Sequence, residues 1–493
     1  MTIPTGGGKT RAALGFAFTH AQTHKHRRVI VALPYTSILD QMASEYADIF
    51  GVDSFLPHYS TWQSPLEDEN NQSESDKARS YAEENWDASL ILTTAVQLFD
   101  SIFSNRPSDC RKLHRLAGSI IVLDEVQALP VNYLSPIVDV LSELVKNYGV
   151  TLLLSTATPV PLDLINTFKI DHPPIELVSN PLGVYRELKR VDYQISTNKV
   201  WNWEQVADEL CTGQQGMVIV NTKKQSLGLF DAVKERESEA LYLSTYLCSA
   251  HRRRVIKEVK RRLLAGEPCV LVTTQIVEAG VDIDFPVVMR AIGPLDRIVQ
   301  AAGRCNREGK PEHGRMVVFL PEDNAMPKGA YETGAHIFQS NVEANRFDPD
   351  DPETFRRYFA ELLGYQQTDG KQIMEYRRAL MFATTAQEFK MIEDDYETNV
   401  LVGYQPDAET DEWNGSPAQK LIEEDHEKRS DLRKLFRDLQ QYSVGVTNRK
   451  LVTLKRLGII TEETATGALI WRGNYDNQIG IGRFEHEKNI GIE

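Results

Sequence analysis

The sequence predicts an α/β fold, in which two domains with parallel sheets in tandem precede a mainly helical C-terminal region. Short, continuous apolar runs recur through the first two thirds of the chain, and polar or turn residues follow them. Continuous rather than alternating runs are typical of parallel strands that are buried on both faces. Helix-like stretches such as 38–50 and 134–147 lie between the runs, and charge-rich helical sequence replaces them after about residue 330.

The first domain is expected to span 1–180, with strands at the apolar runs 29–33, 90–92, 120–123 and 152–154. Ligands of parallel α/β sheets bind beyond the carboxyl ends of the strands. The polar residues that follow these runs therefore mark the expected site. They include Thr36, Thr94, Asp124, Glu125, Ser155 and Thr156.

The second domain is expected to span 181–330, because proline and glycine interrupt the pattern around 169–186. Its strands are expected at 217–220, 270–272, 287–289 and 316–320. The remainder, 331–493, is predicted to be a helical linker and a C-terminal accessory domain. Within it, 393–412 holds eight acidic side chains and no lysine or arginine, which predicts an exposed acidic loop.

Composition places the chain among ordinary globular proteins, with 41% hydrophobic and 25% charged residues. At about 150 residues per domain, its length predicts roughly three domains. The formal net charge of −15 excludes a globally basic nucleic-acid coat, so any phosphate binding has to come from local clusters.

No apolar run approaches the ~18 residues of a membrane-spanning helix, so no membrane association is expected. The five cysteines form no Cys-x-x-Cys pair, which favours a reducing compartment and a cytoplasmic location.

A glycine-rich segment, Gly6-Gly7-Gly8-Lys9-Thr10, opens a predicted helix. Small residues let a backbone wrap a phosphate with its N–H groups, and a helix N-terminus favours the anion. In such a loop the lysine ammonium can reach the β- and γ-phosphates of ATP, and the threonine hydroxyl can ligate Mg²⁺. The strict pattern has glycine where this chain has Ile3, so a plain glycine-rich turn is the alternative for this segment taken alone.

Two adjacent carboxylates, Asp124 and Glu125, follow a predicted buried strand. One carboxylate can hold the magnesium shell while the other orients and deprotonates the attacking water. We assign Asp124 to Mg²⁺ and Glu125 to the water. An ordinary acidic turn is the alternative, and the phosphate loop earlier in the chain disfavours it.

A third set of residues, Gln300, Arg304 and Arg307, projects from one face if the segment is helical, because the residues lie three or four positions apart. Guanidinium groups there can neutralise charge on the γ-phosphate in the transition state. A solvated basic helix face is the alternative, and the phosphate loop and acidic pair make it the weaker one.

In this order, the segments resemble the motifs of superfamily 2 helicases. The matching segments also include 34–37 (motif Ia), 155–158 (motif III), 221–222 (motif IV) and 275–285 (motif V). The amino-acid sequences of four segments resemble those of the CRISPR-associated helicase–nuclease of type I systems. These segments are 4–10, 124–130, 277–285 and 302–309. The resemblance is strong over about 1–320 and weaker at 467–480, and it implies two RecA-like domains.

The resemblance further implies a prokaryotic, ATP- and Mg²⁺-dependent motor that moves 3′ to 5′ along single-stranded DNA. The crRNA-guided type I surveillance complex would recruit it to the displaced strand of an R-loop. By position, the catalytic residues would be Lys9, Asp124, Glu125, Gln300, Arg304 and Arg307. The cofactor-binding residues would be Thr5, Gly6, Gly7, Gly8, Lys9, Thr10, Gln127 and Asp282, with Thr10 and Asp124 on the metal. The residues facing the DNA backbone would be Thr36, Thr94, Asn221, Thr222 and Thr273.

Two departures from the family pattern affect these expectations. Many members have histidine where this chain has Gln127, but glutamine can still form hydrogen bonds between the domains. The family's HD nuclease lies upstream of the phosphate loop, whereas only three residues precede Pro4 here and no His-Asp dipeptide occurs. We therefore expect a truncated chain with a phosphate loop poorly braced by an incomplete first strand, and a separate HD nuclease chain is a candidate partner.

Two other functions stay open at this stage. One is another superfamily 2 enzyme, such as an RNA helicase or a restriction-type translocase, which RNA rather than single-stranded DNA would stimulate. The other is a remnant that binds partners but does not hydrolyse ATP, because the segment before the phosphate loop is short.

We predict that this chain alone does not cleave DNA. Metal-dependent cleavage needs clustered His and Asp ligands, and none of the eleven histidines joins an evident carboxylate cluster. The assay incubates the purified chain with circular single-stranded DNA, ATP and Mg²⁺, Mn²⁺, Co²⁺ or Ni²⁺. Nicking that survives repeated purification, and that disappears when a histidine of this chain is substituted, would overturn the prediction.

Overall fold

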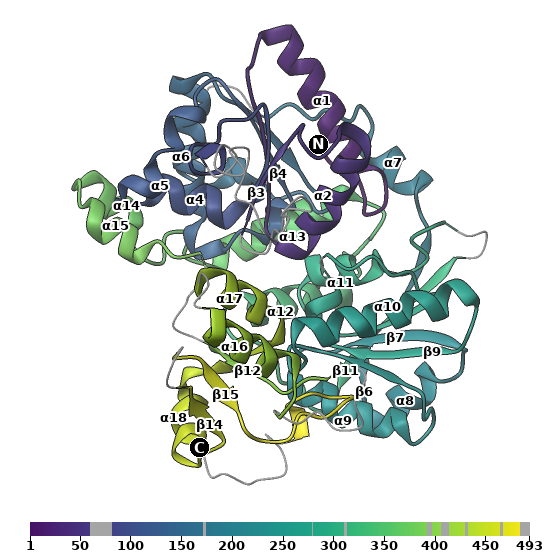
Figure 1. The fold of residues 1–493 in the computed structure, drawn as a ribbon. Coiled ribbons are helices and arrows are strands. Elements are labelled where there is room, and N and C mark those ends of the chain that lie inside the picture. Colours follow the sequence, from purple (N-terminus) through teal and green to yellow (C-terminus); the bar gives the residue numbers. More distant parts are fainter. Residues whose placement is uncertain are drawn as a thin grey trace. The chain divides into compact units, whose positions relative to one another are not determined.

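The computed structural model describes residues 1–59, 81–170, 174–278, 280–309, 313–391, 397–405, 414–428, 432–463 and 467–483. The chain forms two compact units (Figure 1). Unit 1 comprises Met1–Lys189, Gly293–Gly303 and Lys328–Ile392, and unit 2 comprises Arg190–Ile292, Arg304–Pro327 and Glu393–Glu493. The units are interleaved along the chain, and the contiguous domain ranges 1–180, 181–330 and 331–493 stay a prediction.

Unit 1 contains a five-stranded parallel sheet in the order β2-β3-β1-β4-β5. Its strands are β1 (Val29–Leu33), β2 (Leu56–His58), β3 (Leu90–Thr94), β4 (Ile120–Asp124) and β5 (Thr151–Ser155). Every residue of β1, β3 and β4 is buried, which is why their sequences are continuous apolar runs. The strands expected in this region are confirmed. The sequence did not predict β2, because it has only three residues and one of them is Pro57.

Helices cover both faces of this sheet. The helices of the first part of unit 1 are α1 (Lys9–His24), α2 (Thr36–Phe50), α4 (Ala95–Phe103), α5 (Pro107–Cys110), α6 (Leu134–Tyr148) and α7 (Pro181–Glu187). Side chains of α1 and α2 pack with Val29, Val31 and Leu33 of β1, whereas those of α4 and α6 pack with Ile30 and Ala32. This division follows from the alternation of side chains along a strand.

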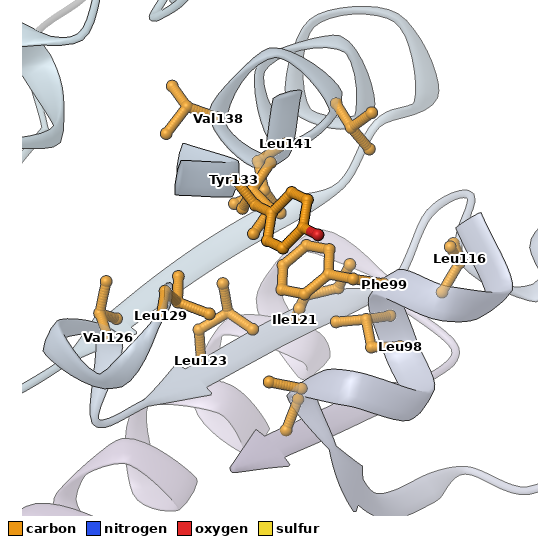
Figure 2. Packing of buried hydrophobic residues seen from close by; sticks show 14 of the residues in the cluster. Leu98, Phe99, Leu116, Ile121, Leu123, Val126, Leu129, Tyr133, Val138 and Leu141 are labelled. Atoms are coloured by element: carbon orange, nitrogen blue, oxygen red, sulfur yellow. The ribbon is translucent and has the colours of Figure 1, made fainter. Parts of the chain in front are cut away.

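Later segments of the chain complete the core on the α4 and α6 face. The later helices of unit 1 are α11 (Leu295–Ala302), α12 (Ala330–Glu343), α13 (Pro352–Tyr365), α14 (Ile373–Arg378) and α15 (Phe382–Glu388). Figure 2 shows part of this core, where side chains of α4, α6 and β4 gather around Tyr133 and Phe99. Phe389 follows α15, and the centroid of its ring lies 3.9 Å from that of Phe103 and 4.9 Å from that of Tyr133.

Unit 2 contains a six-stranded sheet in the order β6-β11-β10-β7-β9-β8, with parallel pairing throughout. Its strands are β6 (Val191–Trp201), β7 (Gln215–Ile219), β8 (Leu241–Leu243), β9 (Cys269–Thr273), β10 (Val287–Ala291) and β11 (Gly314–Pro321). Its first helices are α8 (Trp203–Leu210), α9 (Lys223–Lys234) and α10 (Ser249–Ala265). The prediction of a second parallel-sheet α/β domain is therefore confirmed.

The C-terminal part of unit 2 is helical, as expected, but it also contains a small sheet. Its helices are α16 (Pro417–Lys428), α17 (Leu432–Leu439) and α18 (Asn448–Arg456). The strands β12 (Glu397–Leu401), β13 (Ser443–Thr447), β14 (Ile460–Glu462) and β15 (Leu469–Trp471) form a four-stranded sheet in the order β13-β12-β15-β14. Sequence periodicity does not reveal these strands, because each has only three to five residues.

The expected acidic loop at 393–412 is wrong for the part that the structure describes. Residues 397–401 form β12, which pairs with β13 in an antiparallel ladder. The apolar side chains of Val400, Val402 and Tyr404 are buried, and this burial orders a segment whose charge pattern predicts a loop. Residues 393–396 and 406–412 lie outside the described residues. Among the described helices, none has both the length and the apolar character that crossing a membrane requires.

We predict that Phe389→Ala lowers the free energy of unfolding of unit 1 by about 3–5 kcal/mol, the usual cost of truncating a buried phenylalanine. Phe389 is 3% exposed, whereas Phe382 on α15 is 62% exposed. Phe382→Ala is therefore the matched control, with an expected change within about 0.5 kcal/mol. Urea unfolding monitored by circular dichroism measures both variants, and equal stability of the two would contradict the prediction.

Candidate nucleotide site and helicase motifs

The phosphate-loop segment turns sharply before α1, which begins at Lys9. Gly6 and Gly8 have φ angles of 79° and 77°, which glycine adopts without strain. A Cβ on Gly7 would lie 2.5 Å from Cγ2 of Ile3, so this glycine makes room for the isoleucine that departs from the strict pattern. The first N–H groups of a helix have no carbonyl partner within it, so the N-terminus of α1 is suited to an anion.

The acidic pair lies at the carboxyl end of β4, and Lys9 extends to it. Asp124 is the last residue of β4, and Glu125 follows in the left-handed conformation with φ of 53°. The Lys9 Nζ atom lies 3.3 Å from Asp124 Oδ1, and it donates a hydrogen bond to Glu125 Oε1. Lys9 and Asp124 are each 8% exposed. The structure therefore brings the phosphate loop and the acidic pair together as the sequence predicts.

Charges in this cluster shift one another's pKa values. Burial alone lowers the pKa of Lys9, but the charges of Asp124 and Glu125 outweigh burial, so the pKa lies above its ordinary value. Burial raises the pKa of Asp124, and the Lys9 ammonium offsets this only in part. The raised pKa of Lys9 favours a charged ammonium beside the two carboxyl groups.

Gln127 connects the acidic pair to motif III. Its Nε2 atom donates to Glu125 Oε2, and its Oε1 atom accepts a hydrogen bond of 2.5 Å from the Thr156 hydroxyl. Thr156 in turn accepts a hydrogen bond from the N–H of Thr158 through the same hydroxyl oxygen. The nitrogen and the oxygen of the Gln127 amide therefore both form hydrogen bonds within unit 1. The sequence had suggested hydrogen bonds between the domains instead.

The first residues of the chain run alongside the end of β5. The Ile3 N–H donates to the Thr156 carbonyl at 3.2 Å, and the Thr156 N–H donates to the Met1 carbonyl at 3.3 Å. The Thr2 hydroxyl donates to Glu176 Oε2 at 2.7 Å. The phosphate loop is therefore attached to motif III on its N-terminal side, which corrects the expectation that it is poorly braced.

The residues predicted to hold Mg²⁺ are close together. Thr10 and Asp124 line one small cavity between α1, α2 and the sheet. A hydroxyl and a carboxylate are hard oxygen donors, the kind that Mg²⁺ prefers. The residues present therefore fit this metal.

Motif VI begins on α11, which belongs to unit 1 together with the phosphate loop. Gln300 is 9% exposed, and its Oε1 atom accepts a hydrogen bond of 3.4 Å from Arg297 on the same helix. Arg297 also donates to the Tyr35 hydroxyl at 3.2 Å. A Cβ on Gly303 would overlap the Thr5 side chain, so the end of α11 lies against the loop. Arg297 lies three positions before Gln300 and is a polar residue of this helix that the motif pattern alone does not predict.

Arg304 does not present its guanidinium as the sequence predicts. The residue is 7% exposed, and its Nε and Nη2 atoms donate to the carbonyls of Val277 and Glu278 at 2.9 and 2.8 Å. These carbonyls belong to motif V, so in this structure Arg304 holds motif V in place. The reason is that a buried guanidinium needs nearby acceptors, and this turn supplies two.

Arg307 is the more accessible arginine of motif VI. Its Nη1 atom lies 2.8 Å from Asp282 Oδ1, and its side chain is 30% exposed. Its backbone N–H and that of Glu308 donate to the Asp284 carboxylate at 2.7 and 3.2 Å. Asp282, which the resemblance places among the cofactor-binding residues, thus pairs with a motif VI arginine in this structure. Ala279 of motif V lies outside the described residues.

A buried ion pair that the sequence analysis missed links motifs IV and V. Arg290 on β10 donates to Glu278 Oε1 at 2.8 Å and to Asn221 Oδ1 at 2.6 Å. The side chains of Arg290 and Glu278 are both 0% exposed. A charged residue inside the apolar strand Val287–Ala291 is the signal that could have revealed the pair.

Most of the residues expected to face DNA use their polar groups within the fold. Asn221 and Thr273 are 2% and 0% exposed, and the Thr273 hydroxyl donates to the Leu243 carbonyl at 2.7 Å. The hydroxyls of Thr94 and Thr222 accept hydrogen bonds from backbone N–H groups at the starts of α4 and α9. The expectation for Asn221 and Thr273 is corrected, because buried side chains with partners in the fold present no surface to DNA. Thr36 begins α2 and is half-buried.

Comparison with known proteins agrees with this arrangement. Residues 1–165 match the family of DEAD/DEAH box helicases, and residues 212–310 match "CRISPR-associated nuclease/helicase Cas3, C-terminal". The CRISPR-associated nuclease/helicase Cas3 of Haloferax volcanii is 28% identical over 66% of this chain and 46% of its own length. The "Putative CRISPR-associated nuclease/helicase Cas3" of Methanocaldococcus jannaschii is 25% identical over 65% of this chain and 46% of its own length. The chain thus spans about half the length of the curated relatives it matches.

Solved structures share the fold at low sequence identity. T. fusca Cas3 with AMPPNP is 17% identical with a TM-score of 0.63, over 90% of this chain and 61% of that chain. T. fusca Cas3 with ADP is 17% identical with a TM-score of 0.65, over 97% and 68%. A chain of the structure "CRISPR RNA-guided surveillance complex, pre-nicking" is 15% identical with a TM-score of 0.57, over 97% and 67%. The two α/β domains are therefore RecA-like, as in these proteins.

We predict that Arg304→Gln lowers the melting temperature of the chain, whereas Arg307→Gln does not. The first substitution leaves the buried carbonyls of Val277 and Glu278 without their donors, at about 1–3 kcal/mol for each unsatisfied group. The second removes an exposed ion pair, which contributes about 0–1 kcal/mol. Thermal unfolding of the two matched variants tests the difference, and an Arg304→Gln variant as stable as the parent would contradict it.

Proposed function

Because this chain has the helicase domains of a Cas3-type protein, we propose that it is an ATP-dependent motor that moves 3′ to 5′ along single-stranded DNA in type I CRISPR interference. The observation that carries the proposal is the contact of Lys9 with Asp124 and Glu125. It joins a phosphate-binding loop to an acidic pair at one edge of the sheet, and phosphoryl transfer from ATP to water requires both.

In this proposal the residues of unit 1 bind ATP and prepare the attacking water. Lys9 exchanges its carboxylate partners for the β- and γ-phosphates, while Thr10 and Asp124 hold Mg²⁺. When bound by these residues, Mg²⁺ would neutralise charge on the phosphates. The Glu125 carboxylate, released by Lys9, orients the water and takes its proton. Gln127 steadies Glu125 during this step, because its amide already donates to that carboxylate.

Motif VI supplies positive charge in the transition state. Arg307 is better suited to this role than Arg304, because its guanidinium is partly exposed and pairs with the exposed carboxylate of Asp282. Arg304 supports it by fixing the motif V backbone. Arg297 joins Gln300 as a further polar group near the phosphate loop, since the end of their helix lies against Thr5.

Single-stranded DNA is the proposed track, bound through its phosphates. With a net charge of −15, the chain can contact DNA only through local groups, so binding depends steeply on salt and little on base identity. Of the residues that the sequence analysis assigned to DNA, Thr36 and Thr222 are the two that are not fully buried.

The proposed partners follow from the same likeness. Recruitment by a crRNA-guided surveillance complex is supported by the likeness to the chain in the pre-nicking complex. A separate HD nuclease chain is a further proposed partner, and the prokaryotic cytoplasm is the proposed location.

We predict that Glu125→Gln retains ATP binding but loses at least 100-fold in hydrolysis, since general-base assistance contributes about 10²–10⁴-fold. Lys9→Ala should weaken both, because the phosphates lose their cationic partner. Fluorescent-nucleotide titration measures binding, and phosphate release with single-stranded DNA, duplex DNA or RNA measures hydrolysis.

The results of these assays distinguish the proposed DNA motor from another superfamily 2 enzyme and from a remnant that does not hydrolyse ATP. Parental turnover by Glu125→Gln would refute the assigned role of this residue. Stronger stimulation by RNA than by single-stranded DNA would favour another superfamily 2 enzyme. Failure of the parent chain to bind or hydrolyse ATP would favour a non-hydrolysing remnant.

A further inference from the structure

The segment that leads from unit 1 into unit 2 carries a buried tyrosine. Helix α7 ends at Glu187, and unit 2 begins at Arg190. Tyr185 is 5% exposed, and its ring lies near that of Phe355, with the two centroids 6.1 Å apart. Its hydroxyl donates a hydrogen bond to the carbonyl of Ala157 in motif III. The end of α7 is therefore attached to motif III.

The acceptor of this hydrogen bond lies beside a polar chain that leads to the catalytic glutamate. The hydroxyl of Thr156, the residue before Ala157, donates to Gln127 Oε1 at 2.5 Å, and the Gln127 amide donates to Glu125. Burial, together with the charges of two nearby carboxylates, raises the pKa of Tyr185, so its hydroxyl keeps the proton that it donates. Tyr185 therefore supports the backbone next to the groups that hold Glu125.

Arg190, the first residue of unit 2, contacts motif VI through both its side chain and its backbone. Its Nη1 atom donates to the carbonyl of Arg307. Its own carbonyl accepts hydrogen bonds from Asn306 Nδ2 at 3.0 Å and from the N–H of Gly314 at 2.9 Å. Asn306 is buried and has a φ angle of 48°, so the backbone turns sharply just before Arg307. Arg190 thus holds the turn that carries the accessible arginine of motif VI.

Only four residues separate Tyr185 from Arg190, and we call 185–190 the connecting segment. Leu188 is half-buried, and its Cδ1 atom lies 3.0 Å from the position that a Cβ on Gly7 of the phosphate loop would take. The other three intervening residues are exposed. The side chains of the connecting segment that are not exposed are therefore those that contact helicase motifs.

We propose that Tyr185 and Arg190 are positioning residues, which link the position of motif III to that of the Arg307 guanidinium through the connecting segment. The inference rests on the proposed function, in which Glu125 orients the attacking water and Arg307 stabilises the transition state. Helical residues and short hydrogen-bonded connections are stiff enough to carry a displacement from one site to another. Neither Tyr185 nor Arg190 touches the nucleotide in this role.

The test compares Tyr185→Phe, Arg190→Gln and the double variant with the parent chain. Tyr185→Phe keeps the ring and removes only the donor to Ala157. The kcat for ATP is measured with saturating single-stranded DNA, and Kd is measured by fluorescent-nucleotide titration. Hydrogen exchange of peptides covering 304–309, with and without AMPPNP, is a readout that does not depend on turnover.

The chain offers a matched control for each substitution. Tyr133 is also buried in unit 1, and its hydroxyl also donates to a backbone carbonyl, that of Glu388, at 3.1 Å. Arg262 of unit 2 likewise donates to a backbone carbonyl, that of Glu239, at 3.0 Å. Tyr133→Phe and Arg262→Gln therefore remove the same kinds of hydrogen bond away from the helicase motifs.

We expect each test substitution to lower kcat roughly 10-fold, since a small displacement of groups at a reacting centre can cost up to ~100-fold. The Kd for nucleotide should change by less than about 2-fold, because the role concerns the transition state and not binding. The double variant should lose no more than the weaker single variant, which is the signature of two residues acting as one unit. Tyr185→Phe should also abolish the effect of AMPPNP on hydrogen exchange at 304–309, while both controls behave as the parent.

Four results would overturn the role of the connecting segment. They are an unchanged kcat in Tyr185→Phe, losses that multiply in the double variant, an equal loss of kcat in Tyr133→Phe, and an undiminished effect of AMPPNP on exchange at 304–309. A higher Kd at unchanged kcat would assign Tyr185 to nucleotide binding and would equally refute the proposal. If the parent chain hydrolysed no ATP with single-stranded DNA, the proposed function would be refuted, and this role with it.

Discussion

The placement of the Lys9 ammonium between Asp124 and Glu125 is the constraint on which the nucleotide site depends. Two adjacent carboxylates, one of them almost fully buried, would repel each other strongly without a cation between them. The glycines before α1 bring the lysine into position, and the carboxyl end of β4 presents the acids. A ligand that draws the ammonium toward itself leaves this negative charge unbalanced. Nucleotide and metal binding are therefore coupled by charge in the function proposed here.

Unit 2 also contains a cation paired with a carboxylate, and this pair is completely buried. The Arg290 guanidinium is completely buried, and it is satisfied by Glu278 and Asn221, so residues of two helicase motifs are held by one cation on β10. Removing one partner of such a pair strands a charge in the core, at a cost far above that of a surface ion pair. Arg304 adds two hydrogen bonds to the same turn of motif V. Residues of motifs IV and V and Arg304 of motif VI thus belong to one polar network in this unit.

The sequence predicts strands and contiguous motifs well, but it predicts poorly which groups the side chains contact. Strands such as β1 and β4 are predicted because burial on both faces leaves a direct mark on their composition. The phosphate loop and the acidic pair are predicted because each is a short contiguous segment. Arg304 is misassigned because its acceptors, the carbonyls of Val277 and Glu278, are contributed by a segment some 26 residues earlier, and spacing along a helix carries no information about them. The prediction for Thr273 is wrong for the same reason, because the hydroxyl of this last residue of β9 donates to the Leu243 carbonyl, an acceptor that lies 30 residues earlier in the chain.

The core of unit 1 has a consequence for how this chain folds during synthesis. Ile373 and Phe389 belong to the same buried cluster as Phe99, Ile121 and Leu141, so the α4 and α6 face of the sheet is complete only with residues from near position 390. A ribosome adds about 5–20 residues each second, so the sheet would wait some tens of seconds with this face partly uncovered. Exposed apolar surface of this kind is what chaperones bind. Unit 1 therefore cannot finish folding before most of unit 2 has been made, although its own sheet is encoded within the first 155 residues.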